Sequence, residues 1–205
     1  MNSYNSQNFS IISKLFYGIY ENTTKCLSCQ NIFYNYLQFE FISFSTRDYK
    51  NSLFDLYFGF RDNETIQYLN RNNQYFCNIC QKFSDAEICC KIITPPSKLL
   101  INIDYGKDKI YEVNNLKFDE IIDITEYVNF DFGNRIKYQI SGICTHLGFS
   151  GSSGHYVAYC RNKQTGRWYN FNDSFCRECN KNEIEIFRTF VISVERPKID
   201  FWMLI

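Results

Sequence analysis

Two Cys-x-x-Cys pairs that lie far apart in the sequence constrain the fold of this chain more than any other feature. The first pair is Cys26 and Cys29, and the second is Cys77 and Cys80. Each pair places two thiolates on one side of a tight turn, and two such turns complete the tetrahedral sulfur shell that suits Zn²⁺. Because residues 30–76 must leave this point and return to it, we expect long hairpin arms that bring the two pairs together.

Other interpretations of these cysteines are a redox-active Cys-x-x-Cys and simple buried thiols. Two pairs in one chain favour a single structural Zn²⁺ site. Zinc ribbons that bind nucleic acid carry clustered Lys and Arg, and no such cluster flanks these pairs. A third Cys-x-x-Cys motif, formed by Cys176 and Cys179, has no partner pair nearby. We interpret that motif as incidental, because a zinc site needs four ligands.

The composition of the chain favours a sheet-rich fold, and other features of its sequence favour an intracellular location. The chain has 205 residues, enough for one domain, and 19% of them are aromatic, a residue class that favours strands. The net charge is zero, which gives no indication of nucleic acid or an anionic membrane as a partner. There is no apolar run of membrane-spanning length, and residues 1–7 lack the features of a signal peptide. We therefore expect an intracellular protein of the cytoplasm or nucleus, with free thiols and metal ligands rather than disulfides.

Two adjacent segments carry the residues of a nucleophilic catalytic site. Residues 154–161 read Gly-His-Tyr-Val-Ala-Tyr-Cys-Arg, and residues 167–174 read Arg-Trp-Tyr-Asn-Phe-Asn-Asp-Ser. If they form an antiparallel hairpin, His155 at the start of one strand could meet Asp173 at the end of the next. An imidazole held by a carboxylate is the base of a nucleophilic site, although a surface histidine near an unrelated aspartate is an equally simple reading. The chain has one other histidine, His146, which we interpret as structural.

The same two segments resemble the histidine box of the ubiquitin-specific proteases, papain-like cysteine proteases that cut after the C-terminal glycine of ubiquitin. The resemblance implies His155 as the general base, Asp173 as the residue that orients it, and Asn172 as a possible helper. It also implies ubiquitin or ubiquitinated proteins as partners. The two cysteine pairs resemble the pairs at the tip of the family's fingers subdomain, with Zn²⁺ as the implied structural cofactor.

The resemblance covers the fingers and palm of the family and predicts an α+β, papain-like fold of the ubiquitin-specific protease type. Residues 1–25 or so would be a remnant of the connection from thumb to fingers. Residues 26–95 would form the zinc-binding fingers, and residues 96–205 would form the palm with the histidine box. The N-terminal thumb lobe of the family would be absent.

A Gly/Ser-rich stretch over residues 148–154 directly precedes the predicted base. The simplest interpretation is a hairpin linker. The functional interpretation is that residues with no bulky side chain let a peptide backbone approach the base closely. Ubiquitin ends in Gly-Gly, so the resemblance implies that Gly151, Gly154 and Tyr156 border a narrow tunnel for that tail.

The family's nucleophile lies in a Gly-Asn-Thr-Cys box, and the sequence contains no such box. We expect the chain to be the C-terminal part of a cysteine-type ubiquitin hydrolase and to be inactive alone, because a base without a nucleophile cannot form an acyl-enzyme. Two alternatives stay open. One is a non-catalytic module that binds ubiquitin, and the other is a zinc-ribbon interaction protein.

Overall fold

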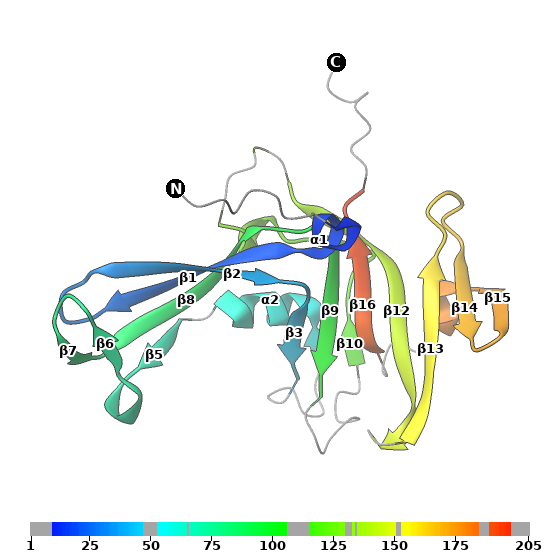
Figure 1. Ribbon diagram of the computed structural model, residues 1–205. Coiled ribbons are helices and arrows are strands. Elements are labelled where there is room, and N and C mark those ends of the chain that lie inside the picture. Colours follow the sequence, from blue (N-terminus) through cyan, green and yellow to red (C-terminus); the bar gives the residue numbers. More distant parts are fainter. Residues whose placement is uncertain are drawn as a thin grey trace.

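The computed structural model is organised around one large sheet with a long arm projecting from it (Figure 1). The structure describes residues 10–46, 53–64, 66–105, 115–129, 133, 135–150, 153–184 and 189–197. The fold is rich in strands and poor in helices, as the aromatic and β-branched composition predicts. No helix within these ranges is both long enough and apolar enough to cross a membrane.

The arm is an antiparallel sheet in the order β2-β1-β8-β5. Its strands are β1 (Gly18–Cys26), β2 (Ile32–Phe39), β5 (Gln67–Leu69) and β8 (Ala86–Thr94). The hairpin of β6 (Tyr75–Cys77) and β7 (Lys82–Ser84) follows a single 3-10 turn, Arg71–Asn73. Figure 1 places this hairpin at the far end of the arm, beside the turn that joins β1 to β2. The arm therefore delivers two turns, distant in sequence, to one point.

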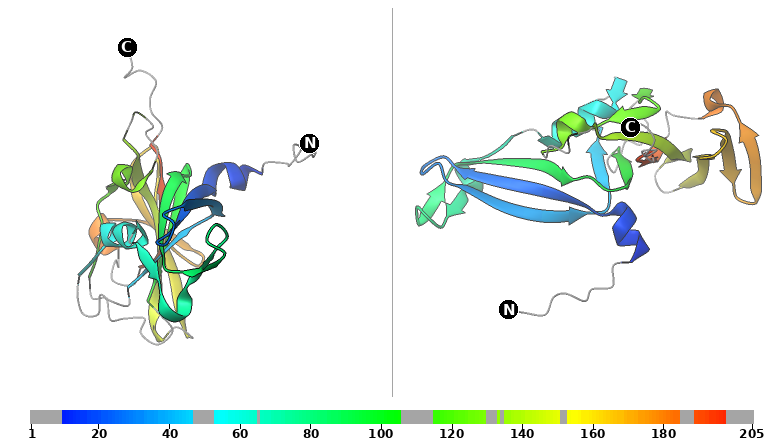
Figure 2. Two further views of the ribbon diagram at one scale, coloured as in Figure 1. Left: turned by 90° about the vertical axis from the view of Figure 1, so that its left-hand side faces the viewer. Right: turned by 90° about the horizontal axis from the view of Figure 1, so that it is seen from above.

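The large sheet has the strand order β15-β14-β13-β12-β16-β9-β3, with β11 paired to the edge of β12. All its pairings are antiparallel except that of β3 with β9. The strands are β3 (Ile42–Ser45), β9 (Lys98–Asp104), β11 (Ile121–Asp123), β12 (Lys137–Ser150), β13 (Ser153–Arg161), β14 (Trp168–Asn172), β15 (Phe175–Cys179) and β16 (Thr189–Glu195). The 3-10 turns Thr125–Tyr127 and Lys181–Glu183 follow β11 and β15. In Figures 1 and 2 the arm and the hairpins of β13, β14 and β15 lie at opposite ends of the molecule.

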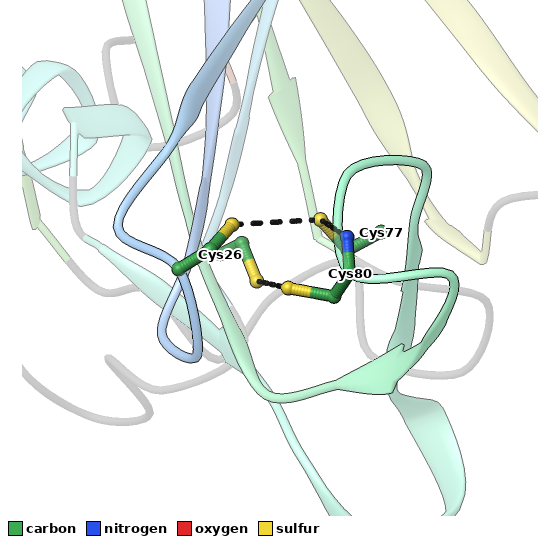
Figure 3. Close-up of side chains that lie close together, drawn as sticks. Cys26, Cys77 and Cys80 are labelled. Atoms are coloured by element: carbon green, nitrogen blue, oxygen red, sulfur yellow. Dashed lines mark hydrogen bonds between the residues drawn. The ribbon is translucent and has the colours of Figure 1, made fainter.

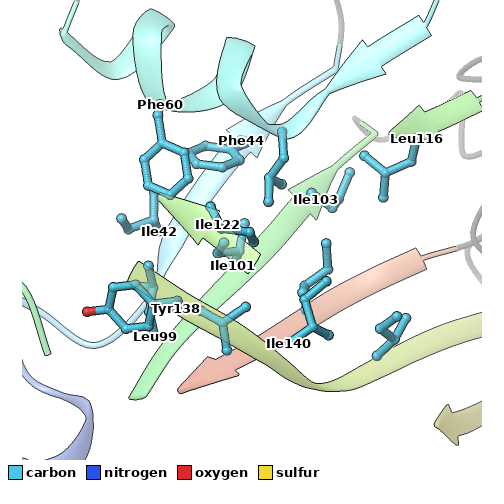
Figure 4. Packing of buried hydrophobic residues seen from close by; sticks show 14 of the residues in the cluster. Ile42, Phe44, Phe60, Leu99, Ile101, Ile103, Leu116, Ile122, Tyr138 and Ile140 are labelled. Atoms are coloured by element: carbon cyan, nitrogen blue, oxygen red, sulfur yellow. The ribbon is translucent and has the colours of Figure 1, made fainter. Parts of the chain in front are cut away.

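The apolar core lies on one face of the large sheet (Figure 4). Alternate residues of β9, namely Leu99, Ile101 and Ile103, are fully buried there, as period-two alternation requires. Helix α2 (Leu56–Glu64) covers this face and contributes Phe60, whose ring meets that of Phe44 edge-on at 4.9 Å. The short parallel pair of β4 (Leu53–Asp55) and β10 (Asn115–Lys117) completes this layer.

The apolar sequence of residues 9–20 fits either a helix or a strand. The described part of this stretch contains both, helix α1 (Ile11–Phe16) and then the start of β1. The strands of the arm and of the large sheet interleave along the sequence. Strand β1 belongs to the arm although it begins at Gly18, whereas β3 pairs with β9 of the large sheet.

Candidate functional site

Four cysteines meet at the tip of the arm. Their sulfur atoms all lie within 4.8 Å of one another, with Cys26 and Cys77 buried. The Sγ atoms of Cys26 and Cys80 are 3.9 Å apart, and those of Cys29 and Cys77 are 3.7 Å apart. A Zn–S bond of about 2.3 Å in a tetrahedron gives a sulfur separation of about 3.8 Å. The spacing therefore fits a tetrahedral metal site, and Figure 3 shows Cys26 facing the hairpin that carries Cys77 and Cys80.

The local structure explains this convergence. Each Cys-x-x-Cys turn is followed by a residue with positive φ, Gln30 at 63° and Gln81 at 55°. The backbone N–H of each glutamine donates to the carbonyl of the first cysteine of its pair, at 2.8 Å in both turns. Matching turns of this kind present both sulfurs of a pair toward the same side, which is the arrangement that a four-sulfur site needs.

The four thiols are electrostatically unequal. A hydrogen bond from the side-chain amide of Asn31, 3.3 Å from Sγ of Cys29, is the main cause that lowers the pKa of Cys29 to about 6. At Cys80 the hydrogen bond with Cys29 is the main cause that raises the pKa to about 12. The pKa of Cys26 is also lowered, mainly by a hydrogen bond from the backbone of Cys29. The cluster thus favours thiolate at Cys26 and Cys29, and thiolate is the form of cysteine that binds metal.

A second cluster lies at the ends of β13 and β14, where His155 and Asn172 meet. Nε2 of His155 is 2.6 Å from Oδ1 of Asn172. The nearest carboxylate oxygen of Asp173 is 3.9 Å from the same nitrogen, and the Asp173 side chain is 78% exposed. The structure brings all three predicted residues together, but the direct hydrogen bond of His155 is to Asn172.

Strand register explains why Asn172 comes closer than Asp173. Ala158 pairs with Phe171, which places Val157 beside Asn172 and on the face that His155 shares. Asp173 lies beyond the end of β14, in the turn to β15, with φ at +50°. Its carboxylate therefore extends toward solvent, while Asn172 keeps the orientation of a strand residue.

The described residues on both sides of positions 151–152 belong to strands. Strand β12 continues through Ser150, and β13 begins at Ser153. Leu147 pairs with His155, and a bulge follows between Leu147 and Ser150. Gly151 lies outside the described residues. Gly154 lies in β13, and Tyr156 is 54% exposed on the face of that strand opposite His155.

His146 lies within β12 and is only 6% exposed. Its ring lies 4.7 Å from that of Tyr156, its register partner. This placement was hidden in the sequence, because nothing there shows that β12 extends as far as Ser150.

Four other cysteines lie away from the imidazole of His155. Cys89 and Cys90 lie on β8 of the arm. Cys144 and Cys160 lie on β12 and β13, and alternation points them to the sheet face opposite His155. Burial raises the pKa of Cys144 and of Cys160, which keeps both thiols protonated.

Comparison with known proteins gives one consistent result. A family model described as "Ubiquitin carboxyl-terminal hydrolase" matches residues 1–201. Ubiquitin carboxyl-terminal hydrolase 26 of Arabidopsis thaliana is 30% identical over 57% of this chain. Ubiquitin carboxyl-terminal hydrolase 48 of Gallus gallus is 26% identical over 86% of this chain. Ubiquitin carboxyl-terminal hydrolase 25 of Arabidopsis thaliana is 26% identical over 91% of this chain. The matched regions span only 12%, 17% and 28% of those three relatives.

Solved structures share the fold. The SAGA Ubp8/Sgf11/Sus1/Sgf73 DUB module bound to ubiquitin aldehyde contains a chain that matches with a TM-score of 0.79 and 22% identity, over 97% of this chain and 45% of that one. A second structure, of a variant of the same DUB module, contains a chain that matches with a TM-score of 0.78 and 23% identity, over 95% and 44%. The β-rich architecture with a projecting arm is therefore the fold of these proteins, and this chain corresponds to somewhat less than half of each.

Proposed function

Because the chain belongs to the ubiquitin carboxyl-terminal hydrolase family, we propose that it forms the zinc-binding fingers and the palm of a cysteine-type deubiquitinase. The arm corresponds to the fingers and the large sheet to the palm. The reaction is hydrolysis of the isopeptide bond that follows the C-terminal glycine of ubiquitin. The observation that carries this proposal is the hydrogen bond between His155 and Asn172 at the head of the β13–β14 hairpin.

His155 is the general base in this proposal, and Asn172 orients it. The side-chain oxygen of Asn172 only accepts hydrogen bonds, so the proton of a neutral imidazole sits on Nε2. The lone pair is then on Nδ1, which is the nitrogen that would take the proton of a cysteine thiol. Asp173 contributes a more distant negative charge that favours the imidazolium formed in that step.

Neither cysteine on β12 and β13 is suited to act as the nucleophile in this proposal. Cys144 and Cys160 project from the wrong face of the sheet, and their raised pKa values oppose thiolate formation. Cys26, Cys29, Cys77 and Cys80 hold a structural Zn²⁺ ion, which fixes the tip of the arm. Ubiquitin, free or on a conjugated protein, is the partner, and its C-terminal tail approaches His155 beside Gly154 at the start of β13.

Two measurements on the 205-residue chain test this proposal. Isothermal titration calorimetry is expected to detect ubiquitin binding, and a fluorogenic ubiquitin C-terminal amide is expected to remain uncleaved. Absence of binding would contradict the ubiquitin assignment. Turnover that survives replacement of every cysteine outside the zinc cluster by serine would contradict a cysteine mechanism.

The placement of Cys144 and Cys160 also favours a second candidate function, a ubiquitin-binding module that performs no catalysis. The mass of the protein in its source cells separates the two. A species well above 24.5 kDa that cleaves ubiquitin conjugates supports the enzyme. A species of 24.5 kDa that binds ubiquitin without cleaving it supports the module.

A further inference from the structure

His146 is buried at a point of the sheet where its neighbours are exposed. Only 6% of His146 is accessible, whereas its register partner Tyr156 is 54% accessible and the side chain of His155 is 40% accessible. Contact with the Tyr156 ring covers one side of the imidazole. Something else must cover the rest of the ring.

The His146 ring lies beside two glycines, Gly148 and Gly154, whose lack of a side chain leaves space for it. A Cβ added to Gly154 would lie 2.3 Å from Nε2 and 2.5 Å from Cε1 of His146, and 2.8 Å from the carbonyl oxygen of Leu147. A Cβ added to Gly148 would lie 2.5 Å from the carbonyl oxygen of Ser153 and 3.1 Å from Cε1 of His146. Real side chains do not tolerate such separations. The imidazole of His146 therefore occupies the space that a side chain at Gly154 would fill, whereas at Gly148 the backbone of Ser153 and Gly154 lies nearer than the His146 ring.

This contact falls beside the proposed base. Gly154 immediately precedes His155, and the pair of His146 with Tyr156 is adjacent to the pair of Leu147 with His155. Beyond that pair the register shifts, so regular pairing no longer fixes the backbone. The ring of His146 thus rests on the last regular part of the hairpin, on the sheet face opposite the His155 side chain.

We propose that His146, seated against Gly148 and Gly154, is a positioning residue that holds the backbone of His155 so that Nε2 stays on Asn172. The His146 ring packs against the backbone at the start of β13 and keeps it in a fixed position. Without it, Gly154 gains free volume in a stretch already weakened by the bulge, and the direction of the next side chain is no longer fixed. This role rests on the proposed function of His155 as base, but its test does not depend on turnover.

The test uses the tautomer of the His155 ring, read by long-range ¹H–¹⁵N NMR of the 205-residue chain. The sequence contains two histidines, so the spectrum holds two imidazoles and the His146→Ala variant leaves His155 alone. In the wild-type chain His155 is expected to show one tautomer with the proton on Nε2. In His146→Ala and in Gly154→Ala we expect the His155 ring to exchange between its two tautomers. The ¹⁵N shifts of its two ring nitrogens should then be averaged.

Gly142 supplies the matched control on the same strand as His146. A Cβ at Gly142 would have its nearest neighbour, the carbonyl oxygen of Tyr159, at an ordinary 3.5 Å. Gly142→Ala is therefore expected to keep the single tautomer. The amide spectrum of each variant reports whether the fold persists. His146→Ala removes atoms and adds no clash, so it decides the question even if Gly154→Ala is too unstable to study.

A double-mutant cycle tests the contact itself. The loss of unfolding free energy caused by Gly154→Ala is expected to be smaller in the His146→Ala background, because the main clash has been removed. An unchanged His155 tautomer in His146→Ala would overturn the proposal. Equal effects of Gly142→Ala and Gly154→Ala on the tautomer would also overturn it, since they would show a general response of the sheet. Ubiquitin binding enters neither result, so failure here is distinct from failure of the proposed function.

Discussion

The side-chain oxygen of Asn172 lies 2.6 Å from Nε2 of His155, closer than either oxygen of the neighbouring Asp173 carboxylate. Either residue could interact with the imidazole of His155, but the two interactions differ. An amide oxygen fixes the ring and its tautomer without adding charge, whereas an exposed carboxylate adds a charge that solvent screens. In the proposed site, these distances favour Asn172 over Asp173 as the residue that orients the ring.

Replacing Asn172 is therefore expected to cost more than replacing Asp173. In a form of the protein that hydrolyses ubiquitin conjugates, Asn172→Ala is expected to lower kcat by about 100- to 10,000-fold, the usual worth of an oriented general base. Asp173→Ala is expected to lower kcat by less than about tenfold, since its charge is exposed. Steady-state kinetics of both variants check this, and a larger loss from Asp173→Ala would reverse the assignment.

The tip of the arm is expected to contain one Zn²⁺ ion per chain. Cys77→Ser is expected to abolish stoichiometric zinc, because the sulfur cage then has three members. Mass spectrometry of metal content on protein purified without chelator measures this. The matched control is Cys176→Ser, an exposed cysteine outside the cage, which is expected to retain the metal.

Removal of that metal is expected to loosen the arm and leave the large sheet intact. Hydrogen exchange after chelation should accelerate at β6, β7 and the adjoining ends of β1 and β8, whose turns depend on the cluster. Strands β9, β12 and β16 should keep their protection because their core lies elsewhere. Uniform loss of protection across the chain would contradict this separation.

The buried hydroxyl of Tyr138 donates to the carbonyl oxygen of Pro96, and the Tyr138 side chain is fully buried. Tyr138→Phe keeps the ring but leaves that carbonyl without this partner. We expect a loss of about 1–3 kcal/mol in the free energy of unfolding, measured by urea denaturation. Tyr68, which is 60% exposed, supplies the control, because Tyr68→Phe should change stability by less than about 0.5 kcal/mol.

Glu195 ties β16 to β9 and to the turn between β13 and β14 through ion pairs with Lys98 and Lys163, each at 3.0 Å. Burial alone would raise the pKa of this carboxyl, but the hydrogen bonds from the two lysines outweigh it and lower the pKa. The stabilisation is therefore complete above the ordinary glutamate pKa of about 4.3 and is lost as the pH falls through the lower folded-state value.

Glu195→Gln is expected to lower the free energy of unfolding by about 0.5–1 kcal/mol at pH 7, a modest value because the lysines are partly exposed. The difference from the wild-type chain should shrink in acid, where Glu195 is itself protonated. Denaturation at a series of pH values measures this. A difference that stays constant down to about pH 3, below the ordinary glutamate pKa, would show that packing, not charge, causes the loss.

Local patterns predicted much of this fold. The nearly continuous apolar run over residues 98–105 predicts a central strand, which is β9, and the Cys-x-x-Cys pairs predict the two turns at the tip of the arm. The stretch around Gly18 fitted both a helical and a strand pattern, because helix α1 ends and strand β1 begins within it. The pairing of β3 with β9 was not predictable, since nothing local specifies a parallel partner so distant in sequence.

The candidate site was likewise only partly predictable from the sequence. The hairpin that brings His155 toward the end of β14 follows from spacing, but the choice between Asn172 and Asp173 depends on a register that the sequence does not reveal. The glycines near His155 suggested room for a substrate backbone. In the structure the missing Cβ of Gly154 also makes room for His146, a contact across two strands that no linear pattern encodes.

Titration of ubiquitin into the ¹⁵N-labelled 205-residue chain tests the central claim most directly, because it reports binding and location together. The account predicts saturable shifts at the ring nitrogens of His155 and the amides of β13 and β14, with weaker binding by ubiquitin that lacks its two C-terminal glycines. The absence of any shift at His155 with ubiquitin at about 1 mM, a concentration that would reveal even weak association, would contradict it.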